Sequence, residues 1–354
     1  MTWQLTLKLQ SLFGGRNSQS AAFPKNDKLL TELENENPQG SSQFSDSKND
    51  NMAHSSTQYG IGSTIAKPRN DILVGQGGTE VSRQNEDAFR LEQFEDGTVL
   101  AAVSDGAGGE GIYCGEWART LLRNLHSEPI RTNEELNRWL KSFWESFYVE
   151  YSAHSKSNPT VHRKFFIEGS LATLSAVWIV PTSGKFFCYG VFCGDSPIFL
   201  LRDGESDPAL EMLFPDSVGA LNQNPYLINW RSEIESEAVV FLNRFELKRG
   251  DVIVLTSDGI GRFLALKELF KYSSPDVMTT IVSEDRQSLL QEHGKLAAFA
   301  KTHAENPSIN ASEVISEIIA AMWLENGFQH YVKKQLELGL IENDDCTIVV
   351  TKIS

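Results

Sequence analysis

Aspartates recur where short apolar runs of the sequence end, and these positions are the ones best suited to chemistry. Ser104-Asp105-Gly106 follows the apolar run 99–103, and Ser257-Asp258-Gly259 follows the run 252–256. Both runs are short, contain β-branched residues and are closed by a turn signal, as buried strands are. Each tripeptide therefore predicts a carboxylate released at the end of a buried strand.

Two further acidic sites have the same relation to apolar runs. Asp195 follows the run 189–194, and Asp344-Asp345 stands directly before the run 346–350. A single Asp-Gly is usually only a turn. Four charged strand ends, however, would each cost desolvation energy unless the charges share a cation. The set therefore predicts that these carboxylates converge around a metal ion.

The residue types favour a hard divalent ion. Oxygen-only ligation selects Mg²⁺ or Mn²⁺, whereas zinc would call for His or Cys, which the two Ser-Asp-Gly motifs lack. Glu86 and Asp87 add acidic ligands, and Arg83 beside them is a cation for an anionic substrate. Two ions held by bridging carboxylates can turn a water into hydroxide and neutralise a phosphoryl group during in-line attack. Hydrolysis of a phosphate ester is the predicted reaction.

The elements that must position these residues are strands and helices in separate blocks. Apolar residues at helical spacing predict helices over 116–125 and 134–151, and a further helical region over about 264–338. Strands are predicted over 170–180, 186–193, 198–201, 239–245 and 347–353. Such blocks predict an α+β fold with an antiparallel sheet.

Composition limits the classes of function. The chain has 354 residues, 40% of them hydrophobic, which is enough for a sizeable core. Its formal net charge of -15 argues against a nucleic-acid partner, because a footprint on phosphates needs a basic surface. The sequence predicts no membrane span and no signal peptide, so we expect a cytoplasmic location. The four cysteines lack C-x-x-C spacing, which fits a reducing compartment.

The N-terminal part of the chain has a different texture. From about residue 14 to 68 it is rich in Ser, Asn, Gln, Gly and Lys, with almost no aliphatic periodicity. Such a segment buries too little apolar surface to offset its ordering entropy. Residues 1–67 are therefore predicted to be a disordered tail. Residues 68–354 are predicted to form one catalytic domain, with a long helical insert at about 264–338.

Taken in order, the motifs resemble those of the metal-dependent Ser/Thr protein phosphatases of type 2C, in the manner of a bacterial member of this PPM-type family. The resemblance runs from about residue 75 to the C-terminus. Its motifs are Asn85-Glu86-Asp87, Val103-Ser104-Asp105-Gly106-Ala107-Gly108-Gly109, Gly169-Ser170-Leu171-Ala172-Thr173, Cys193-Gly194-Asp195-Ser196, Leu255-Thr256-Ser257-Asp258-Gly259 and Asn343-Asp344-Asp345-Cys346-Thr347. One such motif is weak evidence, whereas this many in collinear order are specific.

The resemblance implies a two-sheet antiparallel β-sandwich flanked by α-helices, with two Mg²⁺ or Mn²⁺ ions at one end. It implies that Asp105 bridges both ions and that the carbonyl of Gly106 binds one of them. Asp258 and Asp344 would complete the shell of the first ion. Asp105, Asp258 and Asp344 would then act in catalysis through metal-bound water.

The resemblance also assigns the remaining acidic residues. Glu86 and Asp87 would serve the second ion directly or through water, and Asp195 matches the ligand of a third, weaker metal site. Phosphorylated proteins would be the substrates, and a cognate Ser/Thr kinase would be a partner.

Three positions depart from the family pattern. The phosphate-binding arginine usually stands four residues before the glutamate, where this chain has Ser82, so Arg83 reaches the phosphate only if a bulge restores the register. Ala107 replaces a histidine proposed as general acid in many eukaryotic members. Pro197 stands where arginine is frequent, without touching an expected ligand.

Two other functions remain open at this point. The first alternative is a catalytically weak regulatory pseudophosphatase, or phosphoprotein-binding module, that keeps the fold. The second is a metal-dependent hydrolase of small phosphoesters. The complete set of aspartates favours the protein phosphatase, while Ser82 and Pro197 leave the binding module open.

Overall fold

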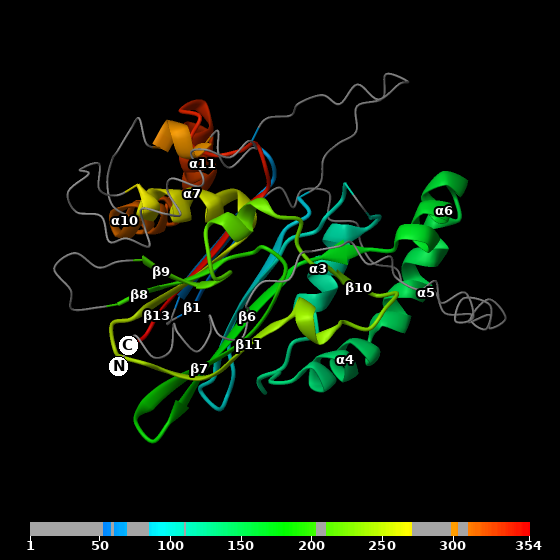
Figure 1. Ribbon diagram of the computed structural model, residues 1–354, viewed down its shortest axis with the longest axis horizontal. Coiled ribbons are helices and arrows are strands. Elements are labelled where there is room, and N and C mark those ends of the chain that lie inside the picture. Colours follow the sequence, from blue (N-terminus) through cyan, green and yellow to red (C-terminus); the bar gives the residue numbers. More distant parts are fainter. Residues whose placement is uncertain are drawn as a thin grey trace. The chain divides into compact units, whose positions relative to one another are not determined.

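The computed structural model of the chain describes residues 52–57, 60–68, 85–109, 111–202, 210–270, 299–303 and 311–354. The chain divides into two units, Met1–Ser47 and Lys48–Ser354, and all described residues belong to the second. In this unit two antiparallel sheets pack together, with helices outside them (Figure 1). The predicted α+β fold, a two-sheet antiparallel sandwich flanked by helices, is confirmed.

The first sheet has six strands in the order β1-β2-β13-β12-β8-β9. In chain order these strands are β1 (Met52–Thr57), β2 (Gly60–Ile65), β8 (Ile198–Leu201), β9 (Leu210–Phe214), β12 (Val252–Thr256) and β13 (Cys346–Lys352). Every neighbouring pair is antiparallel. The last strand of the chain therefore lies between the second and the twelfth.

The second sheet has five strands in the order β11-β7-β6-β4-β3, again all antiparallel. In chain order they are β3 (Ala88–Gln93), β4 (Val99–Ser104), β6 (Leu174–Thr182), β7 (Lys185–Cys193) and β11 (Val240–Leu247). A short ladder of β5 (Leu171–Ala172) with β10 (Ile228–Asn229) lies beyond β6. The end of β4 reaches this ladder through an isolated bridge between Gly106 and Ala172.

Strands of the first sheet are buried on both faces. Along β12, Ile253 and Leu255 pack into the core between the two sheets, while Val254 belongs to a second core beneath helices. On β13, Val349 and Ile348 divide in the same way. Because successive side chains of a strand point to opposite faces, a strand covered on both faces is apolar throughout. This is why these strands appear in the sequence as continuous apolar runs.

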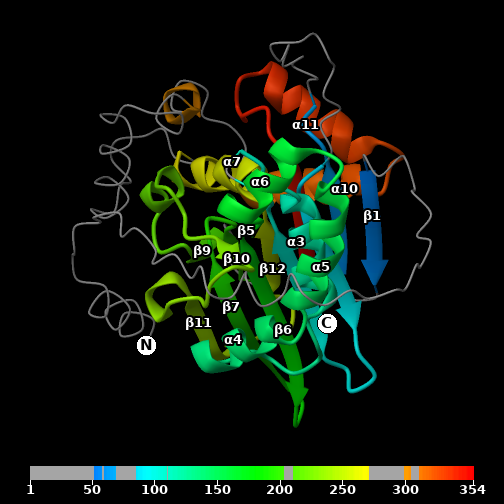
Figure 2. The same cartoon turned by 90° about the vertical axis from the view of Figure 1, so that its right-hand side faces the viewer.

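Helices cover both sides of the sandwich (Figures 1 and 2). The second core joins the first sheet to α7 (Asp258–Leu269), α10 (Ala311–Met322) and α11 (Gly327–Glu337). On the side of the second sheet lie α3 (Cys114–Arg123), α4 (Asn133–Lys141), α5 (Trp144–Ser155) and α6 (Pro159–Glu168). Two 3₁₀ turns, η1 (Gly219–Asn222) and η2 (Ser236–Ala238), interrupt the chain between β9 and β11. No helix in the described ranges has the length and apolarity needed to cross a bilayer.

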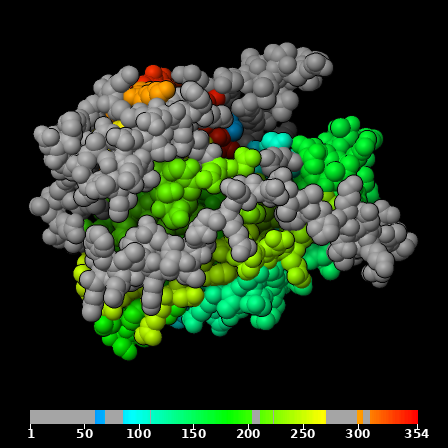
Figure 3. Space-filling model, in the orientation of Figure 1, coloured from blue at the N-terminus to red at the C-terminus, as the bar shows by residue number. Residues whose placement is uncertain are grey.

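Aromatic side chains hold α3 to α6 together. Trp117 of α3 is fully buried, its ring centroid lies 4.8 Å from that of Phe147, and its indole N–H donates to the carbonyl of Ile228 on β10. The helix α4 packs against the segment before β11, because the amide of Asn133 donates to the carbonyl of Ile234 at 3.0 Å. In Figure 3 the green-cyan α4 lies beside this yellow-green segment on the surface.

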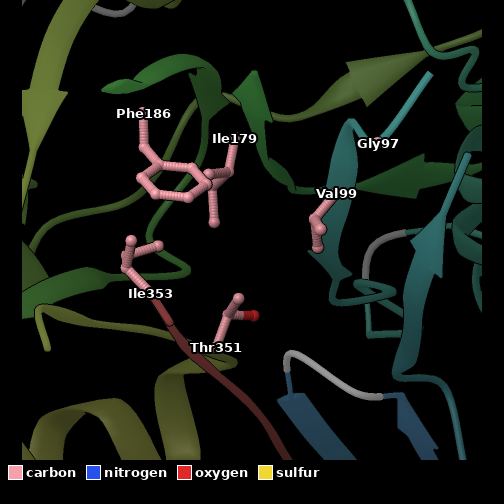
Figure 4. Close-up of a pocket in the computed structure, with 6 residues that line it drawn as sticks. All are labelled: Gly97, Val99, Ile179, Phe186, Thr351 and Ile353. Carbon is pink, nitrogen blue, oxygen red and sulfur yellow. The ribbon is translucent and has the colours of Figure 1, made fainter. Parts of the chain in front are cut away.

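A small cavity lies between the sheets at the end of the sandwich where β4 begins and β13 ends (Figure 4). It has a volume of about 10 Å³ and is lined by Gly97, Val99, Ile179, Phe186, Thr351 and Ile353. A space of this size holds at most about one water molecule. The cavity therefore has no room for a substrate, and it is at the opposite end of β4 from Asp105.

The boundary predicted at residue 68 is too late. The strands β1 and β2 both lie inside the predicted tail, and β2 pairs with β13 from Gly60 to Ile65. The composition of β2 predicted a tail because the strand contains small residues, which here allow close packing. A Cβ on Gly62 would lie 2.5 Å from the ring of Phe89, and Thr64 Oγ1 lies 2.6 Å from Thr347 Oγ1. The rest of the predicted tail, residues 1–51, lies outside the described residues.

The predicted helical region at about 264–338 is helical where the structure describes it. The helix α7 begins earlier than expected, at Asp258, and α10 and α11 follow. Residues 271–298 and 304–310 of the predicted insert lie outside the described residues.

We expect removal of residues 1–67 to abolish cooperative folding, because it deletes β1 and β2 and leaves the edge of β13 without a partner. Ile61 and Ile65 are both buried, and two such side chains contribute roughly 3–6 kcal/mol, a large part of a typical net stability of roughly 5–15 kcal/mol. The measurement is thermal unfolding followed by circular dichroism. Removal of residues 1–47, which takes away no described residue, is the control and should keep a cooperative transition. Two equal melting temperatures would contradict this account of β2.

Candidate metal centre

One edge of the sandwich gathers the acidic strand ends. In the second sheet the start of β3 pairs with the end of β4, Ala88 with Ser104, and the start of β6 pairs with the end of β7. In the first sheet the end of β12 pairs with the start of β13, Thr256 with Ile348. The residues that flank these ends are Glu86, Asp87, Asp105, Gly106, Asp195, Asp258 and Asp344. The structure brings these predicted site residues together.

The backbone of Asp105 is fixed by the neighbouring strand. Its N–H donates to Thr173 Oγ1 at 2.9 Å, and its carbonyl accepts from the N–H of Thr173 at 2.8 Å. The hydroxyl of Ser104 donates to the carbonyl of Thr173, and Thr173 Oγ1 lies 2.7 Å from Ser196 Oγ. Asp105 is thus connected through Thr173 to the residue that follows Asp195.

Asp258 stands in the first turn of α7, directly after β12. The junction is closed by Ser257, whose N–H donates to the carbonyl of Thr347 while its hydroxyl oxygen accepts from the N–H of Thr347. A carboxylate in the first turn of a helix is favoured by the helix dipole. The residue after it has no room for a side chain, because a Cβ on Gly259 would lie 2.7 Å from the carbonyl oxygen of Asp345.

Two glycines let the chain wrap closely around Glu86. A Cβ on Gly108 would lie 1.9 Å from Glu86 Oε1, and a Cβ on Gly106 would lie 2.8 Å from the backbone oxygen of Glu86. The turn is completed by the N–H of Gly108, which donates to the carbonyl of Gly106 at 2.9 Å. The glycines after Asp105 therefore serve close approach.

Asp345 was named with Asp344 among the acidic strand ends, but the sequence analysis gave it no role of its own. Its Oδ1 accepts from the backbone N–H of Lys67 and its Oδ2 from the backbone N–H of Glu86, both at 2.9 Å. One carboxylate thus joins the segment after β2 to the segment before β3.

Lys67 was missed by the sequence analysis, since it lies in the stretch assigned to the tail. Its ammonium forms an ion pair with Asp344 Oδ1. Burial alone would lower the pKa of Lys67, but this ion pair and the charges of Asp345 and Asp105 raise it above its ordinary value. The lysine therefore stays charged at the rim of the site.

Asp87 is the most isolated carboxylate. It is 2% exposed, and neither of its oxygens has a hydrogen-bonding partner of regular geometry among the described residues. Burial, followed by the charge of Asp345, raises its pKa well above the usual range, and the hydroxyls of Ser257 and Thr347 act in the opposite direction. Two orphaned buried oxygens of this kind are suited to a cation.

The other carboxylates repel one another. Burial is the largest cause that raises the pKa of Asp105, followed by the charges of Asp87, Asp258 and Asp195. Burial likewise raises the pKa of Glu86 to about 7 and that of Asp195 to about 7. Without a cation, part of this cluster binds protons near neutral pH.

Arg262 is the second cation of the cluster and was missed by the sequence analysis. Its guanidinium lies 2.8 Å from Asp258 Oδ2, 3.4 Å from Asp195 Oδ2 and 3.5 Å from Glu342 Oε2. The only signal in the sequence was its position four residues after Asp258, which places it on the same face of a helix. Asp195, expected to serve a third metal site, is thus paired with an arginine.

The remaining predicted positions have simple outcomes. Pro197 packs against α7, because a Cβ on Gly261 would lie 2.3 Å from its ring. Ala107 is held by its N–H, which donates to the carbonyl of Leu171. Burial raises the pKa of Cys114 to about 12, so its thiol is not a nucleophile at neutral pH. Ser82 and Arg83 lie outside the described residues.

The donor set fits hard divalent ions in its chemistry. All side-chain donors are oxygens, Asp87 has two unsatisfied buried acceptors, and the carboxyl of Asp105 is close enough to hydrogen-bond to that of Asp258. Such carboxylates suit Mg²⁺ or Mn²⁺. Over the described ranges, however, no three His, Cys, Asp or Glu side chains are grouped as they would be around an ion. Lys67 and Arg262 compensate part of the charge instead.

Comparisons with known proteins identify the family of the chain. The model of the protein phosphatase 2C family matches residues 74–293, which include Glu86, Asp105, Asp195 and Asp258 but not Asp344. A comparison with curated protein sequences gives no match.

Several of the solved structures that match the chain are bacterial phosphatases. The serine/threonine phosphatase of S. agalactiae is 15% identical over 86% of this chain and 99% of its own, with a TM-score of 0.41. The PstP/Ppp phosphatase of Mycobacterium tuberculosis is 17% identical over 86% and 99%, with a TM-score of 0.40. Stp1 from Staphylococcus aureus is 14% identical over 84% and 96%, with a TM-score of 0.40. The family match, which spans more than half of the chain, is decisive: this chain belongs to the protein phosphatase 2C family, as its motifs predicted.

Proposed function

We propose that the chain is a Mg²⁺- or Mn²⁺-dependent phosphatase that hydrolyses phosphoserine and phosphothreonine in proteins. The observation that carries the proposal is the meeting of acidic side chains at one sandwich edge, with both oxygens of Asp87 buried and without a hydrogen bond of regular geometry among the described residues. Two divalent ions bound there would supply an activated water and neutralise the charge of the phosphoryl group.

Each residue has a role in this proposal. Asp105 would hold both ions, with the carbonyl of Gly106 beside it, and Asp258 and Asp344 would hold the first ion. Glu86 and Asp87 would serve the second. The structural support is that two hydrogen bonds hold the backbone of Asp105 at the end of β4, one from its N–H to Thr173 Oγ1 and one from the N–H of Thr173 to its carbonyl. Arg83 would orient the substrate phosphate through a two-pronged guanidinium. A cognate kinase and a cytoplasmic location stay predictions.

A regulatory module without strong activity is the second candidate. Lys67 and Arg262 already compensate Asp344, Asp195 and Asp258, which is the observation that favours it. A hydrolase of small phosphoesters is the third candidate. Turnover of phosphopeptides and of small phosphoesters, each with Mn²⁺ and with a chelator, separates the three. Metal-dependent turnover of phosphopeptides supports the enzyme, and binding of phosphopeptides without turnover supports the module.

Replacing Asp105 by Asn should lower kcat for a phosphopeptide by roughly 100-fold or more, because several kcal/mol of charge stabilisation is lost with the shared ligand. The measurement is initial rate against Mn²⁺ concentration. Asp251→Asn is the matched control, since Asp251 is also a buried aspartate but pairs with Arg202 at the other end of β12. Undiminished turnover of the Asp105 variant would refute the metal mechanism.

Metal and pH should act on stability together. Because the pKa values of Glu86 and Asp195 are raised to about 7, the native protein without metal binds more protons than the unfolded chain between about pH 4 and 7. The contribution of these groups to stability therefore falls as pH rises through this window, and bound Mn²⁺ should offset the fall. We expect a larger Mn²⁺-induced rise in Tm at pH 7.5 than at pH 5.5.

Differential scanning fluorimetry with Mn²⁺ and with EDTA measures this difference. Burial lowers the pKa of His303 to about 4, so its contribution to stability rises with pH. This contribution is the same with Mn²⁺ and with EDTA, and subtracting the two curves removes it. A metal-induced shift that is equal at both pH values would count against metal binding by Glu86.

Replacing Arg83 by Ala should raise KM for a phosphopeptide by roughly 10-fold or more with little change in Mn²⁺ affinity, because one charge-assisted hydrogen-bonding partner of the phosphate is lost. Arg83→Lys should recover only part of the loss, since an ammonium lacks the planar fork. Arg163→Ala on α6 is the control. Unchanged KM and kcat in the Arg83 variant would mean that the metal ions alone, or another cation, hold the phosphate.

A further inference from the structure

The guanidinium of Arg262 places a permanent positive charge inside the carboxylate cluster. It lies one turn along α7 from Asp258, and its Nη2 is 2.8 Å from Asp258 Oδ2 and 3.4 Å from Asp195 Oδ2. Its Nη1 is 3.5 Å from Glu342 Oε2. The guanidinium therefore joins carboxylates from three separate segments: the turn between β7 and β8, the start of α7 and the segment before β13.

The side chain is anchored as well as paired. Its Nε donates to the carbonyl of Leu221 in η1 at 3.2 Å, on a part of the guanidinium that makes none of these ion pairs. Only 21% of the side chain is exposed. Arginine presents five donors in a rigid fork and does not lose its charge in proteins. Held in this way, the fork cannot leave Asp195 and Asp258 without breaking a contact to the backbone.

We propose that Arg262 is the resident cation of the corner formed by Asp195 and Asp258, and that it excludes a metal ion from Asp195. The inference rests on the proposed function, because it accepts the two ions of that function and denies a metal ion only to Asp195. Arg262 is then a positioning residue. It compensates Asp195 and fixes Oδ2 of Asp258, while the two ions would be held by Asp87, Asp105, Asp258 and Asp344, as proposed above.

The other cation of the cluster is held differently. Lys67 pairs with Asp344 through a single ammonium at the end of a flexible stem, and within the described part of the chain its side chain makes no hydrogen bond to the backbone. A lysine of this kind can rotate its side chain away from the carboxylate and leave the position to a metal ion. The anchored arginine has no such freedom, so we assign exclusion to Arg262 alone.

The experiment counts bound Mn²⁺ per chain by native mass spectrometry, with isothermal titration as the second measurement. Arg262→Ala should bind one ion more than the parent, and Arg262→Lys should bind the same number as the parent. Arg202→Ala is the matched control, because Arg202 also pairs with a buried aspartate, Asp251, outside the cluster. It should leave the count unchanged.

The added ion should need the carboxylate of Asp195, so Arg262→Ala combined with Asp195→Asn should return to the parent count. Equal counts in the parent and in Arg262→Ala would overturn the inference.

Asp195→Asn in the otherwise unchanged chain keeps the test decisive if Arg262→Ala fails to fold. If Arg262 excludes metal from Asp195, this substitution leaves the number of bound ions unchanged. The loss of one ion would identify Asp195 as a metal ligand and overturn the inference. The parent itself tests the proposed function separately: two ions support that function and none contradicts it, whereas the role of Arg262 is decided by the difference between variants.

Discussion

Repulsion among carboxylates at one edge of the sandwich is the constraint around which the rest of the site is built. Both sheets end their strands at this edge, so the fold that buries the apolar runs also forces Asp87, Asp105 and Asp258 together. The surrounding backbone holds them there. Thr173 clamps Asp105, and Ser257 closes the junction that starts α7. The stability of the fold and the charge of the site are therefore coupled, because neither sheet can release its aspartate without losing pairing beside it.

The negative charge of the cluster is compensated in one part and not in another. Cations of the chain compensate one part, with Lys67 on Asp344 and Arg262 on Asp195 and Asp258. Asp87 has no such partner in the part of the chain that the structure describes, and its pKa is raised mainly by burial. A buried carboxylate without a partner is costly unless it binds a proton or a cation. A bound metal ion would therefore contribute most to stability at the uncompensated part of the cluster.

The sequence was sufficient for the features that depend on local pattern. The runs before Asp105 and Asp258 predicted buried strands, because strands covered on both faces are apolar throughout. It was insufficient where distant segments meet. The strand β2 consists mainly of small residues that fit closely against Phe89 and Thr347, which composition alone cannot distinguish from a disordered tail. The pairing of Lys67 with Asp344 joins segments 277 positions apart, and no local pattern predicts it.

Arg262 differs from these missed contacts because its position relative to Asp258 can be predicted from the local sequence. Its spacing of four from Asp258 predicts a shared helix face once α7 is known to begin at Asp258. The helix was expected to start six residues later, at residue 264, so the spacing did not predict a shared helix face for Asp258 and Arg262. The same junction that ends β12 at Thr256 and starts a helix at once therefore does two things. It releases the carboxylate of Asp258 at the sheet edge, and it sets an arginine one turn behind that carboxylate. A loop between strand and helix would have allowed the first without the second.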